Sequence, residues 1–219
     1  MTDAAERFFN ERSSMVEQQL RQRGIRDERV LAAMRKVPRH EFVSEQRWPE
    51  AYADHPVVIP EQQTTSQPYI IAAMLQSAEI KPQERVLEIG AGSGYQTALL
   101  AELAAQVIAI ERYPTLADAA RQNLARLGYR NVTVMVGDGS LGVLEFAPYD
   151  AIIVSAAAPR VPHALLHQLA PGGRLVLPVG DAEQQFLQLV QRNPDGTVTI
   201  HKLEGCRFVP LIGQQGFAA

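Results

Sequence analysis

The chain has 219 residues, of which 46% are hydrophobic and 21% are charged, as in an ordinary soluble globular protein. Its net charge of −3 and the lack of a basic block disfavour a nucleic-acid-binding surface, and its single cysteine, Cys206, excludes an internal disulfide. The N-terminus carries charges where a signal peptide has an apolar core, and no apolar run approaches the roughly 20 residues of a membrane span. We therefore expect a cytoplasmic, soluble, monomeric protein that binds neither nucleic acid nor a membrane.

Residues 1–80 contain helix-like segments and loops without a strong strand pattern. Gly24 is expected to end a first helix. Asp27 is a suitable N-cap for a second helix, which Pro38 would end. The apolar stripe of this second helix consists of Val30, Leu31, Met34 and Val37.

From about residue 84 onward, short aliphatic runs alternate with helical segments. Alternation of this kind predicts a parallel sheet wrapped by helices on both faces, an α/β doubly wound, Rossmann-like fold. A final pair of runs at 185–192 and 197–211, joined by the turn sequence NPDG, predicts antiparallel strands at the sheet edge. The expected parallel strands are 85–90, 106–111, 132–137, 149–155 and 173–180, and the expected helices lie around 95–105, 115–128 and 162–170.

A glycine-rich loop joins the first predicted strand to the first helix of this region. Gly90, Gly92 and Gly94 permit positive φ angles and close backbone approach, and the following helix N-terminus offers N–H donors to a ligand. A dinucleotide fingerprint would place its third glycine at position 95, where Tyr95 stands, which disfavours a nicotinamide oxidoreductase. A purely structural turn is the alternative.

Acidic residues flank this loop and the next strands. The spacing of the glycines after Glu88 resembles the S-adenosylmethionine (AdoMet) loop of class I methyltransferases. Glu111 ends the next predicted strand, 21 residues after Gly90, where an acid can accept hydrogen bonds from both ribose hydroxyls. Asp138 follows the third strand and could bind the adenine amino group, unless it serves only a turn. AdoMet is therefore the expected cofactor.

The stretch TTSQPYIIAAM, which begins at Thr64, holds more hydroxyl groups than one helix cap needs. Pro68 is expected to start a helix with Gln67 as its cap, which leaves Ser66 outside. Thr64, Thr65 and Ser66 then form a neutral hydrogen-bonding rim beside a positive helix end, which suits an anionic acceptor. An ordinary capping cluster is the alternative.

The kind of acceptor follows from acid–base chemistry. An alcohol or amine needs a base to remove its proton, whereas a carboxylate with a pKa of about 4 arrives ionised at neutral pH and needs only orientation and partial desolvation. The stretch from Thr64 to Met74 contains no His or Asp that could act as a base, which favours a carboxylate acceptor.

Several motifs are spread along the chain: RGIRDERVLAAMRKVPRHEFV, TTSQPYIIAAM, VLEIGAGSGYQTALLA, GDGSLG, YDAIIVSAAAP, QLAPGGRLVLPVG and RFVPL. With these motifs the chain resembles the bacterial protein-L-isoaspartate O-methyltransferases over nearly its whole length. This family transfers methyl from AdoMet to the α-carboxylate of L-isoaspartyl residues in damaged proteins and peptides, and the resulting ester collapses to a succinimide. The resemblance implies an N-terminal helical region at the substrate cleft, residues 1–80, and an AdoMet-binding domain, residues 81–219.

The resemblance also implies roles for individual residues. Ser66 matches the active-site serine, to which we assign a hydrogen bond to the acceptor carboxylate and no nucleophilic role. Pro210 and Leu211 match a segment that folds over the site. The expected cofactor-binding residues are Gln63, Thr64, Thr65, Ser66, Glu88, Gly90, Ala91, Gly92, Ser93, Gly94, Glu111, Arg112, Asp138 and Gly139.

Two positions depart from the family pattern. Gln62 stands where a glycine is expected and Val143 where an aromatic residue is expected, which bears on substrate range and rate more than on reaction type. His163 and His167 have a spacing that could share a metal, but no third ligand cluster accompanies them, so we expect no metal site. The alternatives are a methyltransferase that acts on a small-molecule hydroxyl or amine, and a non-catalytic AdoMet-binding adaptor.

Overall fold

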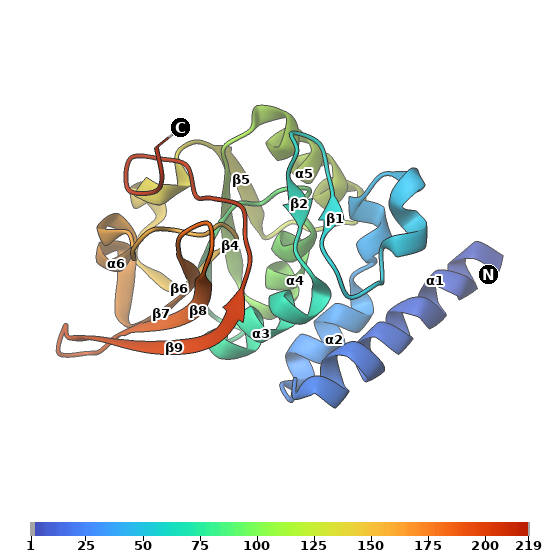
Figure 1. Ribbon diagram of the computed structural model, residues 1–219, viewed down its shortest axis with the longest axis horizontal. Coiled ribbons are helices and arrows are strands. Elements are labelled where there is room, and N and C mark those ends of the chain that lie inside the picture. Colours follow the sequence, from blue (N-terminus) through green and yellow to red (C-terminus); the bar gives the residue numbers. More distant parts are fainter. Residues whose placement is uncertain (1–2, 219) are drawn as a thin grey trace.

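The computed structural model describes residues 3–218. Its centre is a seven-stranded sheet with the order β5-β4-β3-β6-β7-β8-β9, in which the first five strands are parallel and the last two are antiparallel (Figure 1). The strands are β3 (Arg85–Ile89), β4 (Gln106–Glu111), β5 (Val132–Val136), β6 (Tyr149–Val154), β7 (Leu169–Gly180), β8 (Gln185–Arg192) and β9 (Val198–Cys206). The predicted doubly wound, mostly parallel α/β fold with antiparallel C-terminal strands is confirmed.

Strand β7 begins earlier than the sequence pattern predicts. Leu169 already pairs with Tyr149 of β6, and the next pair is Arg174 with Ala151, so residues 170–173 lie opposite a single residue. Residues 171–173, Pro-Gly-Gly, which stand where the predicted strand should begin, are therefore an excursion inside the strand. The helix that precedes β7, α6 (His163–Gln168), is correspondingly shorter than predicted.

Helices cover both faces of the sheet because successive strand residues point to opposite sides. Val86 and the apolar residues that point to the same face from the neighbouring strands form one hydrophobic cluster with the N-terminal helices and with α3, α4 and α5. Leu87 and the apolar residues that point to the opposite face from the neighbouring strands form a second cluster with α6. The helices of the first cluster that adjoin the sheet are α3 (Pro68–Ala78), α4 (Tyr95–Leu103) and α5 (Pro114–Arg126), and the short turns η5 (Gly139–Leu141) and η6 (Leu144–Phe146) follow β5.

The N-terminal region is helical, as its sequence predicts. Gly24 ends the first helical run with a φ of 101°, and Asp27 caps α2 by accepting hydrogen bonds from the backbone N–H groups of Arg29 (2.8 Å) and Val30 (3.3 Å). Both boundaries were predicted from local rules. The elements are α1 (Asp3–Ser14), η1 (Met15–Leu20), η2 (Arg21–Arg23), α2 (Glu28–Lys36), η3 (Arg39–Phe42) and η4 (Glu45–Glu50).

A small hairpin follows these helices. Strands β1 (Val57–Val58) and β2 (Thr64–Thr65) pair in antiparallel fashion, and the sequence showed no pattern for strands this short. In Figure 1 the hairpin lies on the side of the N-terminal helices, and the chain that follows β9 lies on the side of α6. Residues of both segments line one cavity.

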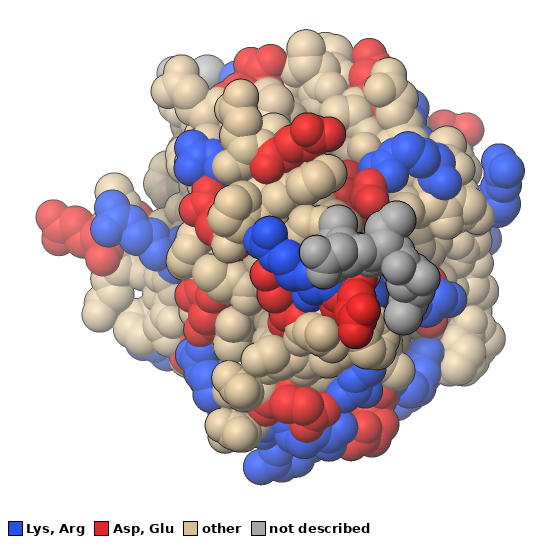
Figure 2. Space-filling model, turned by 90° about the vertical axis from the view of Figure 1, so that its right-hand side faces the viewer, with Lys and Arg blue, Asp and Glu red and all other residues tan. Residues whose placement is uncertain are grey.

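The surface carries charges of both signs. On the face shown in Figure 2, Lys and Arg side chains are interspersed with Asp and Glu side chains. Several of these charges form exposed ion pairs, such as Arg21 with Glu28 (2.6 Å) and Lys36 with Glu102 (2.7 Å). Among residues 3–218, no helix is long and apolar enough to cross a membrane.

Candidate active site

A main cavity of about 420 Å³ lies at the carboxyl ends of β3, β4 and β6, between the hairpin and the C-terminal segment Val209–Ile212. Parallel α/β sheets bind ligands at this edge, and the volume falls in the range of small-molecule sites. The predicted site residues that line it are Gln63, Thr64, Thr65, Ser66, Gly90, Ala91, Gly92, Ser93, Glu111, Arg112 and Gly139.

The glycine loop and Glu111 form one side of the main cavity. Gly92 has a φ of 55°, and its N–H donates to Oε2 of Glu111 at 2.8 Å. The other oxygen of Glu111 accepts from the N–H groups of Arg112 (2.7 Å) and Tyr113 (3.0 Å). The loop and the following turn therefore hold this carboxylate at the cavity wall, where it can accept hydrogen bonds from a diol.

Two polar atoms of the wall have no partner of their own. The Oγ atom of Ser93 and the Oε1 atom of Gln96 are buried, and neither makes a hydrogen bond within the described part of the chain. Because buried polar atoms are normally paired, both indicate a polar ligand in the main cavity. Together with the glycine loop and Glu111, they suit the ribose and amino-acid portions of AdoMet.

Glu88, a predicted cofactor-binding residue, lies outside the cavity lining. It is fully buried beneath the start of α4, where it accepts hydrogen bonds from Gln96 Nε2 (3.1 Å) and Thr97 Oγ1 (2.5 Å). Burial raises the pKa of Glu88 to about 8 despite these hydrogen bonds. Gly94 also lies outside the lining and caps α4 with a φ of 95°.

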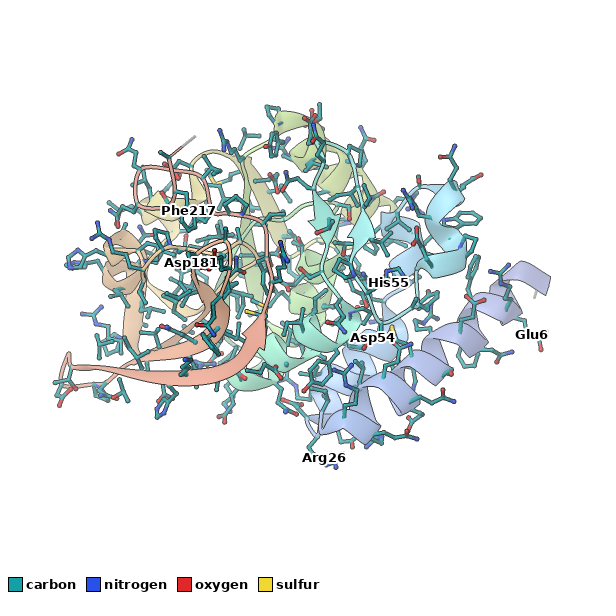
Figure 3. All side chains as sticks on the ribbon, in the orientation of Figure 1. Glu6, Arg26, Asp54, His55, Asp181 and Phe217 are labelled. Atoms are coloured by element: carbon teal, nitrogen blue, oxygen red, sulfur yellow. The ribbon has the colours of Figure 1, made fainter. Side chains whose placement is uncertain are left out.

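Asp138 is the third predicted residue outside the lining. Its carboxylate accepts from Ser140 N–H (2.9 Å), Ser140 Oγ (2.6 Å) and Gln214 N–H (2.8 Å). Burial opposes ionisation, but these hydrogen bonds outweigh it and lower the pKa of Asp138. The carboxylate therefore ties the last turn of the chain, around Gln214 and near Phe217 in Figure 3, to the end of β5.

A smaller side hollow of about 90 Å³ adjoins the main cavity. The two spaces share Thr64, Ser66, Ser155 and Val209, so Ser66 lies where they meet. The side hollow is also lined by Pro56, Gln67, Ile70, Gly205, Cys206, Arg207 and Phe208.

The N-terminus of α3 opens near this junction. The helix starts at Pro68 with Gln67 as its cap residue, as predicted, but the Gln67 side chain does not cap it. Instead Gln67 Nε2 donates to Oδ2 of Asp54 at 2.8 Å, below the hairpin in Figure 3. The first turn of α3 thus keeps its N–H donors free of side-chain acceptors, and the helix end stays positively polarised.

Gln96 and Ser155 were not predicted as site residues. Gln96 Nε2 donates to Ser155 Oγ at 2.8 Å and so links the glycine-loop helix to the end of β6. Gln96 lies in the glycine-loop motif and Ser155 in the motif YDAIIVSAAAP, and only the adjacency of β3 and β6 brings them together.

The remaining candidates lie away from both spaces. Val143 is buried in the cluster beneath α6, where its N–H donates to Gln168 Oε1 at 2.8 Å. The Nε2 atoms of His163 and His167 are 3.1 Å apart. Within the described chain, no group of three or more His, Cys, Asp or Glu residues is placed to hold a metal.

The sheet order, the glycine loop and the acid at the end of β4 define a class I AdoMet-dependent methyltransferase. Residues 10–216 match the family described as protein-L-isoaspartate(D-aspartate) O-methyltransferase, and the chain belongs to this family. A relative from Koribacter versatilis named protein-L-isoaspartate O-methyltransferase is 56% identical over 211 residues, covering 96% of this chain and 95% of the relative. A relative of the same name from Methanoculleus marisnigri is 57% identical over 208 residues, covering 94% of each chain.

Solved structures agree with this assignment. One protein-L-isoaspartate O-methyltransferase superposes with a TM-score of 0.84 at 29% identity, covering 94% of this chain and 67% of that chain. A Plasmodium falciparum structure described by the same activity and solved with S-adenosyl-L-homocysteine has a TM-score of 0.80 at 28% identity, covering 92% of this chain and 98% of that one.

Proposed function

We propose that this enzyme transfers the methyl group of AdoMet to the α-carboxylate of L-isoaspartyl residues in damaged proteins and peptides. The observation that carries the proposal is the meeting of the main cavity and the side hollow at Ser66. The main cavity suits the cofactor, and the side hollow is open to a peptide side chain beside the free end of α3. The resulting methyl ester collapses to a succinimide, whose hydrolysis restores some normal aspartate.

The main cavity holds the cofactor through groups that are already oriented. Glu111 would accept hydrogen bonds from the ribose hydroxyls, the Ser93 hydroxyl could donate to or accept from a polar group of the cofactor, and Gln96 Oε1 could accept from one. Bound AdoMet supplies an electrophilic methyl group on a sulfonium. The C-terminal segment Val209–Ile212 lines the same cavity, and we assign to it the role of limiting the access of water.

The acceptor is held by neutral donors. We assign the Ser66 hydroxyl and the first turn of α3 to the acceptor carboxylate, one oxygen of which attacks the methyl carbon in line as the carbon–sulfur bond breaks. The carboxylate is already ionised, so no residue needs to remove a proton. Ser66 therefore positions the acceptor and forms no covalent bond.

The wider setting of the enzyme is also part of the proposal. We take a single chain as the working unit and the cytoplasm as the compartment. The unpaired thiol of Cys206 is compatible with the reducing cytoplasm.

The direct test uses methyl-labelled AdoMet with an isoaspartyl peptide and its normal aspartyl twin. We expect base-labile label on the isoaspartyl peptide alone, because a methyl ester hydrolyses in mild base. Base-stable label on a small-molecule hydroxyl or amine would replace the proposal with that activity. Cofactor binding without transfer to any acceptor would replace it with a binding role.

A further inference from the structure

Arg39 is a buried cation directly behind the segment that lines both spaces. Its side chain is fully buried, and its guanidinium donates to the carbonyl oxygens of Ala51 (2.8 Å) and Ser66 (2.8 Å) and to Oγ1 of Thr65 (3.1 Å). The guanidinium also lies 4.7 Å from the centre of the Tyr95 ring. Both Tyr95 and the Thr65–Ser66 segment line the main cavity.

All of these partners are neutral. Within residues 3–218, no carboxylate lies at ion-pairing distance from Arg39, although most buried cations have an anionic partner. Asp54, whose charge acts on Arg39, is already paired with Arg23 and accepts from Gln67. The positive charge of Arg39 is therefore not cancelled inside the folded chain.

We propose that Arg39 is the fixed positive charge that positions the Thr65–Ser66 segment and makes the site favour a negatively charged acceptor over a neutral one. This inference rests on the proposed function and adds a specificity-determining residue to it. Charge interactions are screened far less in a buried site than at the surface. Because Nη2 of Arg39 donates to the Ser66 carbonyl oxygen, its charge lies directly behind the residue whose hydroxyl we assign to the acceptor carboxylate.

The arrangement has a chemical advantage for methyl transfer. A direct Arg–carboxylate pair would engage both acceptor oxygens and reduce their nucleophilicity. A cation held behind the backbone attracts the carboxylate while the hydroxyl of Ser66 and the N–H groups of α3 orient it. One oxygen is then left free to attack.

The test compares binding of two peptides that differ only in charge at the acceptor group. One is a fluorescent isoaspartyl peptide, and the other is the isoasparaginyl peptide, in which the α-carboxylate is a carboxamide. Their Kd values are measured by anisotropy with saturating S-adenosylhomocysteine, which prevents turnover. We expect the wild-type enzyme to bind the carboxylate at least about tenfold more tightly.

The neutral variants Arg39→Met and Arg39→Gln should reduce this ratio to about one to two, while Arg39→Lys should retain most of it. The matched control is Arg29→Gln. Arg29 is half-buried and also donates to backbone carbonyls, of Ile80 and Leu103, but it lies outside both spaces. This variant should leave the ratio unchanged. Melting temperature and S-adenosylhomocysteine affinity confirm that each variant folds.

A merely structural role for Arg39 would weaken binding of both peptides equally and leave the ratio intact, which would overturn the inference. If neither neutral variant folds, the Kd ratio of the two peptides for the wild-type enzyme is the test. A ratio below about two would show that the site does not select the charged acceptor, and would overturn the inference. Wild-type enzyme that fails to methylate the isoaspartyl peptide would instead refute the proposed function itself. The two failures are therefore distinguishable.

Discussion

Ser66 lies at the junction of the main cavity and the side hollow, so its hydroxyl can reach an acceptor beside a bound cofactor. Replacement by alanine removes one hydrogen bond to a charged group. Such a bond contributes roughly 1.5–3 kcal/mol, so we expect Ser66→Ala to lower kcat/KM for an isoaspartyl peptide about 10- to 100-fold.

The cofactor provides the internal reference for this prediction. The Kd of S-adenosylhomocysteine should change much less than kcat/KM, because we assign the ribose to Glu111 and not to Ser66. Ser44→Ala, which alters an exposed serine outside both spaces, is the matched control. An equal loss in cofactor affinity for Ser66→Ala would show that this serine serves the cofactor and not the acceptor.

The sequence predicted individual residues well where a local rule applied. Glu111 was expected at the end of β4 as a carboxylate for a diol, and it lies at the cavity wall. Glu88 was expected to contact the cofactor because it precedes the glycine loop. It shares the face of β3 with Val86, which α4 covers, and sequence distance alone does not reveal this face.

At the scale of elements, the hairpin β1–β2 shows how the chain tolerates a missing glycine. Gln63 N–H donates to the carbonyl of Pro60 at 3.2 Å, and the two residues between them, Glu61 and Gln62, have φ angles of 59° and 56°. Positive φ at both central residues is the requirement of a type I′ turn, for which glycine is preferred. Gln62 thus adopts a left-handed conformation that a glycine would adopt without strain.

This conformation predicts a stabilising substitution. A non-glycine residue in the left-handed region costs about 1–2 kcal/mol, and the greater freedom of glycine in the unfolded chain offsets about 0.4–1 kcal/mol of the gain. We expect Gln62→Gly to raise the free energy of unfolding by roughly 0.5–1 kcal/mol, measured by urea denaturation.

Gln63→Gly is the control for this prediction. Gln63 does not have a positive φ, so glycine brings only its unfolded-state freedom and should destabilise the protein. If Gln62→Gly proves as destabilising as Gln63→Gly, the turn is not strained in solution.

The boundaries of α2 and α3 could be predicted because Asp27 and Pro68 act on their immediate neighbours. The start of β7 could not, because Leu169 becomes a strand residue only through its pairing with Tyr149. The side hollow was also beyond sequence reasoning, since its walls come from the hairpin, α3 and the chain after β9. Arg39 was quoted within a motif but not singled out, because arginine is mostly exposed.

For the whole molecule, Glu88 links stability to pH. Its pKa is about 8 in the folded chain, raised by burial from an ordinary 4.5, so the folded state holds a proton that the unfolded state releases between these values. The stability that this extra proton gives the folded state is fully present below pH 4.5 and is lost as the pH rises toward 8. Over this range the free energy of unfolding falls by at most about 1.4 kcal/mol per pH unit.

Glu88→Gln removes this titration and can still accept from Thr97. We therefore expect the free energy of unfolding of the variant, relative to wild type, to increase steadily from about pH 5 to about pH 8. Denaturation curves at several pH values measure this difference. Parallel stability profiles for the two proteins would show that Glu88 ionises in the folded chain as it does in the unfolded one.

The central claim for the whole enzyme is that an already ionised carboxylate is oriented by neutral donors, with no general base. Its most direct test is the single-turnover rate of methyl transfer to an isoaspartyl peptide, with cofactor and peptide saturating, between about pH 5.5 and about pH 7.5. We predict a rate that stays constant within about twofold, because an acceptor with a pKa near 4 is ionised throughout. A rate that rises about tenfold per pH unit would reveal a proton that must be removed by a base, and would contradict the account.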